Sequence, residues 1–425
     1  MRLAPYRQVL ALPGVTTVLV LTTLARIPVL AGGMVLTLHV VLSLEKGFGA
    51  AGTVFAVAVV GGAIGQPLAG RLTDRYGLRP VSIAGTLVAL GFWASVGFMN
   101  YPTLLVASFV ANVIQVPVFT VSRQALAALV PEQQRRTAYS LDSTAVELSF
   151  MAGPSLGTIL VTQTSAQTAT WVVGVGVVLS GVAFYLVNPP LRNESDDAAA
   201  SLPRPALRTW LGSGMIAVLI TATGATLVLG ASEVAVVARL TESDDLAWAS
   251  LVMALWSVYS LTGGLVYGGL RRAPGPIPLM TLLGATTVLV AFPSTWYWML
   301  VAMVPAGVLT APTIAAGADA VSRLAPAAVR GEAMGYYGAA TNLGVAVGYP
   351  AAGVVIDAYG AGWGFASAGL VGVAIGMIAV LITRAAKLRQ PRDRQPGDRP
   401  RGDRQPVLPE GDAPESTPMV VGSSQ

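Results

Sequence analysis

Apolar segments of membrane-spanning length recur along the whole chain. A helix that crosses the hydrocarbon core of a bilayer needs roughly 20 predominantly apolar residues. Twelve segments approach or exceed that length, and short turn-like stretches separate them. They cover residues 12–42, 50–70, 80–99, 102–128, 138–162, 168–187, 210–239, 246–270, 277–293, 295–322, 333–357 and 361–384. The sequence therefore predicts an all-α membrane protein with twelve transmembrane helices.

The composition agrees with this class and excludes several functions. Hydrophobic residues make up 54% and charged residues 11% of the chain, whereas ordinary soluble domains are about one quarter charged. The chain has no cysteine and a single histidine, so it has no disulfide, no thiol chemistry and no His or Cys cluster for a metal. It also lacks a Gly-x4-Gly-Lys-Ser/Thr phosphate loop and a catalytic triad. We expect no metal, no cofactor, no enzymatic activity and no ATP-driven pump.

The distribution of basic residues predicts the orientation in the membrane. Of the 26 Lys and Arg residues, Arg26 lies inside the first segment, and only Lys46 and Arg239 fall in the odd-numbered loops. The other 23 lie at the N-terminus, in the even-numbered loops or in the C-terminal tail, and such charge marks the cytoplasmic side. We expect a multi-pass protein of the plasma membrane with both termini cytoplasmic. Its basic residues are then topology signals and not nucleic-acid contacts.

The chain divides into two similar halves near residue 200. Residues 188–209 are polar and rich in proline, and they form the longest loop between segments. The halves repeat with an offset of about 195 residues: Arg123, Pro131 and Gly153-Pro154 correspond to Arg323, Pro326 and Gly348 with Pro350. We predict an N-terminal six-helix bundle over residues 1–187, a cytoplasmic linker over 188–209 and a C-terminal six-helix bundle over 210–384.

The end of the chain differs in composition from the rest. From about residue 385 to 425 it is charged, rich in proline and nearly without apolar residues. Such a segment cannot bury enough surface to fold, so we predict a disordered cytoplasmic tail. As an alternative, its arginines contact anionic lipid headgroups.

A dense charge cluster interrupts the apolar pattern between the second and third segments. The order Gly70, Asp74, Arg75, Gly77 and Arg79 resembles the loop motif that joins the second and third transmembrane helices of the major facilitator superfamily. That motif ends in two basic positions, of which the first is Leu78 here. Together with the repeat, the resemblance covers residues 1 to about 385. It implies the fold of that superfamily, in which two pseudo-symmetric six-helix bundles surround a central site.

The resemblance implies that this loop is a gate and not a substrate site. Its glycines let the second and eleventh helices approach closely. Asp74 is expected to face the positive N-terminal end of a neighbouring helix while the transporter is open outward, and to pair with arginines such as Arg123. In the repeat, Gly269 stands where Asp74 would recur. The alternative is that these charges only orient the protein, but Asp contributes little to the positive-inside signal.

A second motif lies in the fifth segment, where Gly153-Pro154 is followed by Gly157. It resembles a motif of the drug/proton antiporters within the superfamily. Pro154 frees a backbone carbonyl that neighbouring groups must satisfy, and the glycines provide small packing faces. We interpret the motif as a pliable helix, with ordinary helix packing as the alternative.

Ionisable side chains inside the segments are the candidate transport residues. Each costs roughly 2.5–3.5 kcal/mol at the bilayer centre, and therefore tends to face a cavity or a partner. They are Arg26, His39, Asp142, Glu147, Glu233 and Asp319. At about 1.5 Å per residue, Arg26 and Glu147 lie roughly 20 Å and 13 Å from the cytoplasmic ends of their helices. We predict an ion pair or a shared proton-dependent contact between them; the alternative is a static pair that only orients the helices.

Further polar side chains extend this candidate site. Glu147 and Asn342 are 195 residues apart, so the repeat places them at equivalent points and suggests a shared site between the halves. Glu233 is expected near the outer face, as a rim charge or a proton site. His39 lies at a similar depth, as a titrating group or as one that is merely hydrogen-bonded. Other candidate contacts are Asn112, Gln115 and Trp256, the one tryptophan well inside a segment.

The leading hypothesis is a secondary transporter that exports a small apolar or cationic compound in exchange for protons. It rests on the two motifs and on the small number of hydrogen-bonding side chains in the predicted cavity. One alternative is uptake of a polar metabolite, such as a sugar or an organic anion, with Arg26 as an anion contact. Another is a membrane sensor or scaffold that does not transport. The expected partners are the small-molecule substrate, protons and the lipid bilayer, and the protein is expected to be a monomer.

Overall fold

Helices account for all the regular structure that is described. The computed structural model describes residues 4–192, 205–245, 248–270, 272–293 and 295–389. The helices of the first half are α1 (Ala4–Leu10), α2 (Val15–Leu42), α3 (Phe48–Tyr76), α4 (Leu78–Ser95), α5 (Tyr101–Val113), α6 (Val118–Leu129), α7 (Glu132–Gln163) and α8 (Ala166–Val187). Those of the second half are α10 (Leu207–Trp210), α11 (Ser213–Glu242), α12 (Ala249–Gly269), α13 (Pro276–Leu289), α14 (Trp296–Leu324), α15 (Arg330–Tyr359) and α16 (Ala361–Arg389).

The prediction of twelve membrane spans is confirmed. Within the described residues, eleven helical spans are long and apolar enough to cross a bilayer. The twelfth, α13, has 14 residues and coincides with the ninth and shortest predicted segment. The predicted tail begins later than expected, because α16 continues to Arg389. Residues 390–425 of that tail, and residues 193–204 of the predicted linker, lie outside the described residues.

The fourth span is broken, although its sequence predicts one continuous helix over residues 102–128. Helix α5 ends at Val113 and α6 begins at Val118. Pro117 explains the break, because proline lacks a backbone N–H and its ring clashes with the preceding turn. The irregular backbone is buried against α4: a Cβ atom added at Gly85 would lie 2.8 Å from the backbone nitrogen of Val116. Non-helical backbone is tolerated at membrane depth where protein covers it in this way.

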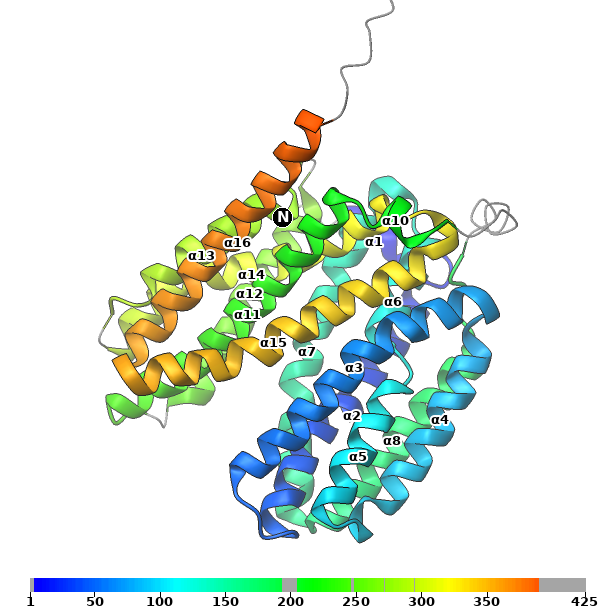
Figure 1. Cartoon of the computed structure of the whole chain (residues 1–425), viewed down its shortest axis with the longest axis vertical. Helices are drawn as coiled ribbons and strands as arrows, with labels where there is room; N and C mark the ends of the chain where they lie inside the picture. The colour runs from blue at the N-terminus through cyan, green and yellow to red at the C-terminus, as the bar shows by residue number, and fades with distance from the viewer. Residues whose placement is uncertain (1–3, 193–204, 246–247, 271, 294, 390–425) are drawn as a thin grey trace, which may run out of the picture.

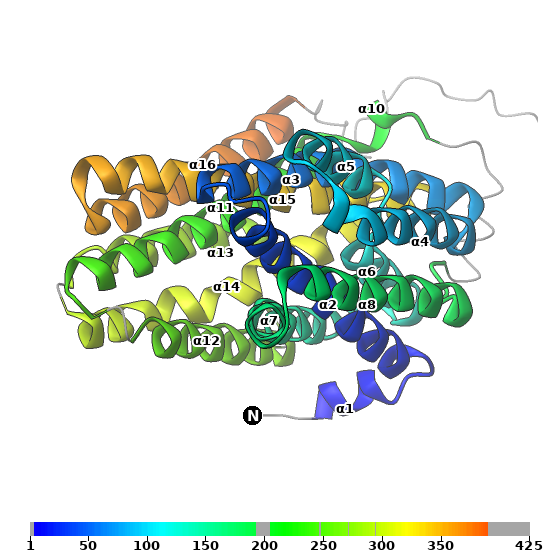
Figure 2. The same ribbon diagram turned by 90° about the horizontal axis from the view of Figure 1, so that it is seen from below.

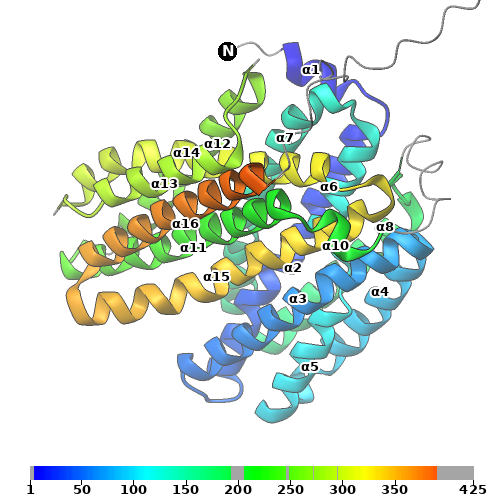
Figure 3. The same ribbon diagram turned by 45° about the horizontal axis from the view of Figure 1, so that its top comes forward.

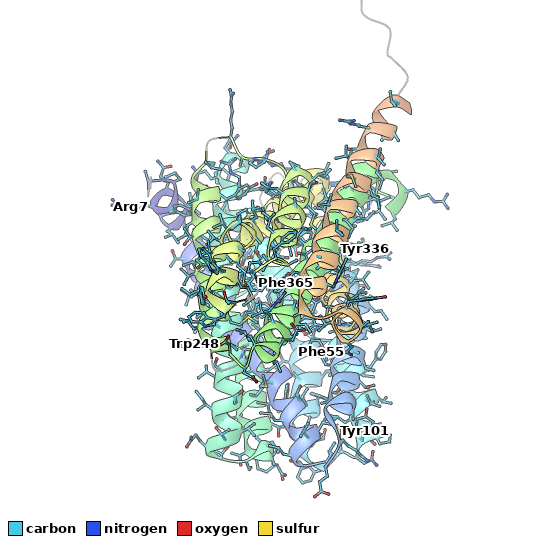
Figure 4. The ribbon with its side chains drawn as sticks, turned by 90° about the vertical axis from the view of Figure 1, so that its left-hand side faces the viewer. Arg7, Phe55, Tyr101, Trp248, Tyr336 and Phe365 are labelled. Carbon is cyan, nitrogen blue, oxygen red and sulfur yellow. The ribbon has the colours of Figure 1, made fainter. Side chains whose placement is uncertain are left out.

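The helices form two bundles that meet chiefly where α3 and α7 of the first contact helices of the second. Helices α2 to α8 make the N-terminal half and α11 to α16 the C-terminal half (Figure 1). Helix α3 packs on α15, and α7 packs on α12 and α14 (Figure 2). The bundles are close together at the end that carries α1 and α10, and they diverge toward the opposite end (Figure 1). Arg7 and Tyr101 mark these two ends (Figure 4).

The buried cores follow the same division. The largest apolar cluster draws on both halves near the end that carries α1, and includes Val9, Leu126, Tyr139, Met334 and Tyr337. Two further clusters each belong to a single half. Among the described residues, shared apolar burial therefore holds the bundles together at the end that carries α1, since the hydrophobic contribution scales with the apolar area removed from water.

Candidate functional site

Asp74 joins the two halves at their closed end. It lies in the last turn of α3, and 6% of its surface is exposed. Its carboxylate accepts hydrogen bonds from the backbone N–H groups of Gly331 (3.1 Å) and Glu332 (2.8 Å), in the first turn of α15. The side chain of Gln124 in α6 donates another, at 2.9 Å. The predicted contact with the positive end of a helix is confirmed, because the first N–H groups of a helix have no intrahelical partner.

The predicted pair of Asp74 with Arg123 is wrong. Arg123 Nε lies 3.7 Å from Asp142 Oδ2 within the N-terminal half, and its guanidinium lies 4.8 Å from the Tyr337 ring centroid. Neighbouring residues of a helix point about 100° apart, so when Gln124 reaches Asp74, Arg123 points elsewhere. Arg123 still links the halves, through the ring of Tyr337 in α15.

The glycines of the loop motif permit this contact, and its arginines point away from it. A Cβ atom at Gly70 would lie 2.2 Å from the backbone oxygen of Gly331, so only glycine lets α3 and α15 approach this closely. Gly77, with φ of +83°, makes the left-handed turn between α3 and α4. Arg75 and Arg79 are exposed and lie over the rings of Tyr76 and Tyr185.

The two halves meet along two lines of contact, or seams, of which the first joins α3 to α15 through Asp74. The second seam, between α7 and α12, uses hydroxyl groups in place of a carboxylate. Thr137 Oγ1 donates to the backbone oxygen of Gly268 at 2.7 Å, and Ser140 donates to that of Gly264. Tyr6 of α1 donates to the backbone oxygen of Leu265, so α1 extends from the N-terminal half to α12 (Figure 3). Burial raises the pKa of the Tyr6 hydroxyl, which keeps the donor proton in place.

Arg26 forms an ion pair, but its partner is Asp142 and not the predicted Glu147. Arg26 Nη2 lies 2.6 Å from Asp142 Oδ1, with 0% and 1% of the two side chains exposed. Ser122 donates to the same oxygen at 2.6 Å. Asp142 and Glu147 are five residues apart, which places them about 140° apart around α7. Asp142 faces α2, whereas Glu147 faces α12.

Two glutamates lie at the boundary between the halves without a basic partner in the described part of the chain. Glu147 accepts a hydrogen bond of 2.7 Å from Ser260 of α12, which belongs to the other half. Glu233 of α11 accepts one from Tyr349 of α15. Both side chains are partly exposed, and the two carboxylates are within electrostatic range of each other.

Two amide side chains lie beside Gly62 at the seam between α3 and α15. A Cβ atom at Gly62 of α3 would lie 3.3 Å from both Gln115 Nε2 and Asn342 Nδ2. Gln115 lies in the break of the fourth span, and Asn342 lies in α15. The predicted grouping of Glu147 with Asn342 is therefore divided between two seams. Asn112 donates to the backbone oxygen of Ser108 in its own helix, at 2.9 Å.

Comparison with protein families decides which family this arrangement belongs to. The model of the Major Facilitator Superfamily matches residues 18–291 and 215–417. The chain belongs to the major facilitator superfamily. No curated protein matches it in sequence.

Solved structures of superfamily members share the fold. The human organic anion transporter MFSD10 has 16% sequence identity and a TM-score of 0.66, over 86% of this chain and 100% of that one. The proton:xylose symporter XylE has 15% identity and a TM-score of 0.66, over 86% and 95%. A bacterial homologue of the iron transporter ferroportin, in its outward-facing state, has 15% identity and a TM-score of 0.67, over 88% and 99%. At these identities the likeness shows the fold alone.

The Gly-Pro motif of this superfamily member packs α7 on α2. Cβ atoms at Gly153 and Gly157 would lie 2.6 Å from Leu30 Cβ and 2.9 Å from the Ala31 backbone oxygen. Pro154 lies inside α7 between these contacts. The glycines are therefore needed for close helix packing. This agrees with the interpretation of the motif as ordinary helix packing.

The remaining predicted residues lie inside single halves. His39 is 2% exposed, and it lies in α2 near Val96 of the N-terminal core. Trp256 lines a small cavity of about 10 Å³ together with Ser232. Neither the Trp256 nitrogen nor the Ser232 hydroxyl has a hydrogen-bond partner in the described structure.

Sequence reasoning missed five contributors to the seams, which are Tyr6, Gln124, Thr137, Ser140 and Ser260. Tyr6 lies in a helix of seven residues, too short to stand out by periodicity, although the apolar spacing from Tyr6 to Val9 was a usable signal. Gln124 and Ser260 are uncharged, and no local pattern distinguishes them from residues that face lipid.

Proposed function

We propose that this protein is a secondary active transporter that exports a small apolar or cationic compound in exchange for protons. It lies in the plasma membrane with α1 and α10 on the cytoplasmic side. One observation carries the substrate class: the buried arginine Arg26 is neutralised by Asp142, whereas Glu147 and Glu233 have only hydroxyl partners among the described residues. The charge available at the boundary between the halves is therefore negative.

The asymmetry of the two ends supports alternating access. The closed end has two seams, built on Asp74 and on Ser140, and the shared apolar core. Toward the other end the halves diverge (Figure 1), as expected for a state that is open to the outside. Opening the closed end requires Asp74 to leave α15 and the shared core to separate, while the opposite ends approach. Rocking of the bundles about a fixed site accomplishes both movements.

The two glutamates give a simple scheme for exchange. A carboxylate in a poorly solvated site binds either a proton or a cation, because an uncompensated buried charge is strongly disfavoured. Glu147 also reaches across a seam, to Ser260. Protonation of Glu147 weakens the hydrogen bond that its carboxylate accepts from Ser260. Binding of a proton at Glu147 is therefore linked to closure of the seam between α7 and α12.

A second candidate is the transport of an organic anion. Arg26 favours it, because Nε and Nη1 of its buried guanidinium have no hydrogen-bond partner in the described structure. An anion that reached these atoms would compete with Asp142 for the arginine. The present geometry offers such an anion no exposed surface, since 0% of the Arg26 side chain is exposed.

The test is transport by the purified protein in liposomes with an acidic interior. We expect uptake of a fluorescent lipophilic cation that stops when a protonophore collapses the pH gradient. Glu147→Gln and Glu233→Gln should abolish gradient-driven uptake, whereas Glu45→Gln, in an exposed loop, should leave it unchanged. Uptake that persists in both glutamine variants contradicts the proposed proton site. Accumulation of organic anions alone, lost in Arg26→Met, supports the second candidate.

A further inference from the structure

Three arginines and two tyrosines form an exposed patch at the loop between α3 and α4, on the face that points away from α15. This arginine patch consists of Arg71 and Arg75 at the end of α3, Arg79 at the start of α4, and the rings of Tyr76 and Tyr185. All five side chains are exposed, including 56% of Tyr76 and 39% of Tyr185. Asp74 shares the same turn of α3 but points inward to α15. The patch is therefore the external face of the turn that seals the closed end.

Two of these arginines, Arg75 and Arg79, lie over tyrosine rings in a way that leaves their hydrogen-bonding edges exposed. The Arg75 guanidinium carbon lies 5.1 Å from the Tyr76 ring centroid, and that of Arg79 lies 5.6 Å from the Tyr185 centroid. An aromatic ring attracts a guanidinium to its face and leaves the N–H groups at the rim available. In the described part of the chain, none of the three arginines pairs with a carboxylate. Two of the three positive charges, on Arg75 and Arg79, thus lie over tyrosine rings, and none of the three has a carboxylate counter-ion among the described residues.

The surroundings place this charge at the border of the membrane. Exposed apolar side chains adjoin the patch at Leu72, Leu186 and Val187, with 38%, 68% and 44% of their surfaces exposed. Tyrosines concentrate at the level of lipid headgroups, where one side of the ring is apolar and the other wet. The arginines therefore lie where a phospholipid presents its phosphate.

We propose that the arginine patch is a binding site for the headgroups of anionic phospholipids. Guanidinium groups bind phosphate in a bidentate manner, and anionic lipids are enriched in the cytoplasmic leaflet. The spacing of Arg71 and Arg75 by four residues puts both on one face of α3, so a single headgroup can reach both. The inference rests on the cytoplasmic placement of this loop in the proposed function. A bound lipid would contact the turn that carries Asp74 on the face opposite to α15.

The experiment measures binding of phosphatidylglycerol to the full-length protein in phosphatidylcholine nanodiscs, by a labelled lipid. The variant Arg71→Gln/Arg75→Gln/Arg79→Gln should bind about 100-fold more weakly, at about fivefold per arginine. A matched control, Arg208→Gln/Arg272→Gln/Arg384→Gln, removes the same charge from three exposed sites at the same end, and should change binding less than threefold. Tyr76→Leu/Tyr185→Leu, which keeps every charge, should weaken binding severalfold.

Three results would overturn the proposal. The patch variant could bind the lipid as tightly as the unmodified protein, or the control variant could lose as much affinity as the patch variant. Competition by inorganic phosphate at equal potency would indicate a free-phosphate site. Because binding is measured at equilibrium without a substrate or a gradient, failure of transport would not affect the result. A patch variant that binds the lipid normally would overturn the lipid proposal whether or not that variant transports.

Discussion

The exchange of Asp74 for asparagine tests the closed end most sharply. Asparagine has nearly the same shape but keeps only one acceptor atom. One of the two N–H groups, from Gly331 or Glu332, then faces an amide NH₂ in a site where only 6% of residue 74 is exposed. A hydrogen bond to a charged group contributes about 1.5–3 kcal/mol, and a buried donor without a partner costs about 1–3 kcal/mol.

We therefore expect Asp74→Asn to destabilise the closed end by about 3 kcal/mol. At 1.36 kcal/mol per tenfold change, this moves the equilibrium between the two states by about 150-fold. A population of 99:1 in favour of the state that is closed at this end would become close to even. Little of this is lost to solvent screening, because the site is buried.

The assay is a distance measurement by pulsed electron spin resonance. The chain has no cysteine, so Leu186→Cys and Leu324→Cys, at exposed ends of α8 and α14, introduce two labels without background. In the unmodified background we expect one short distance, and in Asp74→Asn a second, longer distance of comparable population. Glu132→Gln is the control, since its pair with Arg323 is 3.8 Å long and about half exposed. Such pairs contribute about 0–1 kcal/mol.

Two outcomes would refute the reasoning. The first is an unchanged distance distribution in Asp74→Asn, which would mean that the capping of α15 does not hold the closed state. The second is an equal shift in Glu132→Gln, which would mean that any lost charge at this end has the same effect. Either outcome would mean that the charges of the loop from Gly70 to Arg79 only orient the protein in the membrane.

Three further changes test other parts of the account. Gly70→Ala should force α3 and α15 apart and raise the long-distance population, because its methyl group would lie 2.2 Å from a backbone oxygen; Gly91→Ala, with nothing within 4 Å, should not. Tyr6→Phe should shift the same equilibrium about fivefold through one lost hydrogen bond, whereas Tyr101→Phe, which loses a bond within one half, should leave it unchanged. Asp142→Asn should lower the melting temperature more than Arg26→Met does. The first variant leaves Arg26 and Arg123 without a carboxylate, whereas in the second variant Asp142 keeps its contacts with Ser122 and Arg123. An equal fall in melting temperature in the two variants would contradict this reasoning.

Positions along the helix axes were predictable from the sequence. Apolar segments of about 20 residues predict the twelve spans, and the ninth, over residues 277–293, is the shortest of them. Pro117 was a visible signal for the break in the fourth span, but the apolar character continues across it. Hydropathy alone therefore merged α5 and α6.

Positions around the helix axes were not predictable. Depth alone pairs Arg26 with Glu147, but the partner in the structure, Asp142, lies on another face of the same helix. The sequence likewise pairs Arg123 with Asp74, although the neighbouring Gln124 makes that contact. Depth follows from counting residues at a fixed rise. The face that a residue presents to its neighbours follows from the packing of whole helices, which no local pattern encodes.

The most direct test of alternating access locks the closed end and measures transport. A Cβ atom at Gly264 would lie 3.9 Å from Ser140 Oγ, so Ser140→Cys with Gly264→Cys places two thiols across the seam between α7 and α12. We predict that oxidation to the disulfide abolishes cation uptake in liposomes, and that reduction of the same sample restores it, with both single variants insensitive to oxidant. Full transport by the verified disulfide form would contradict the account, because a carrier that works with its closed end locked does not alternate between the two sides.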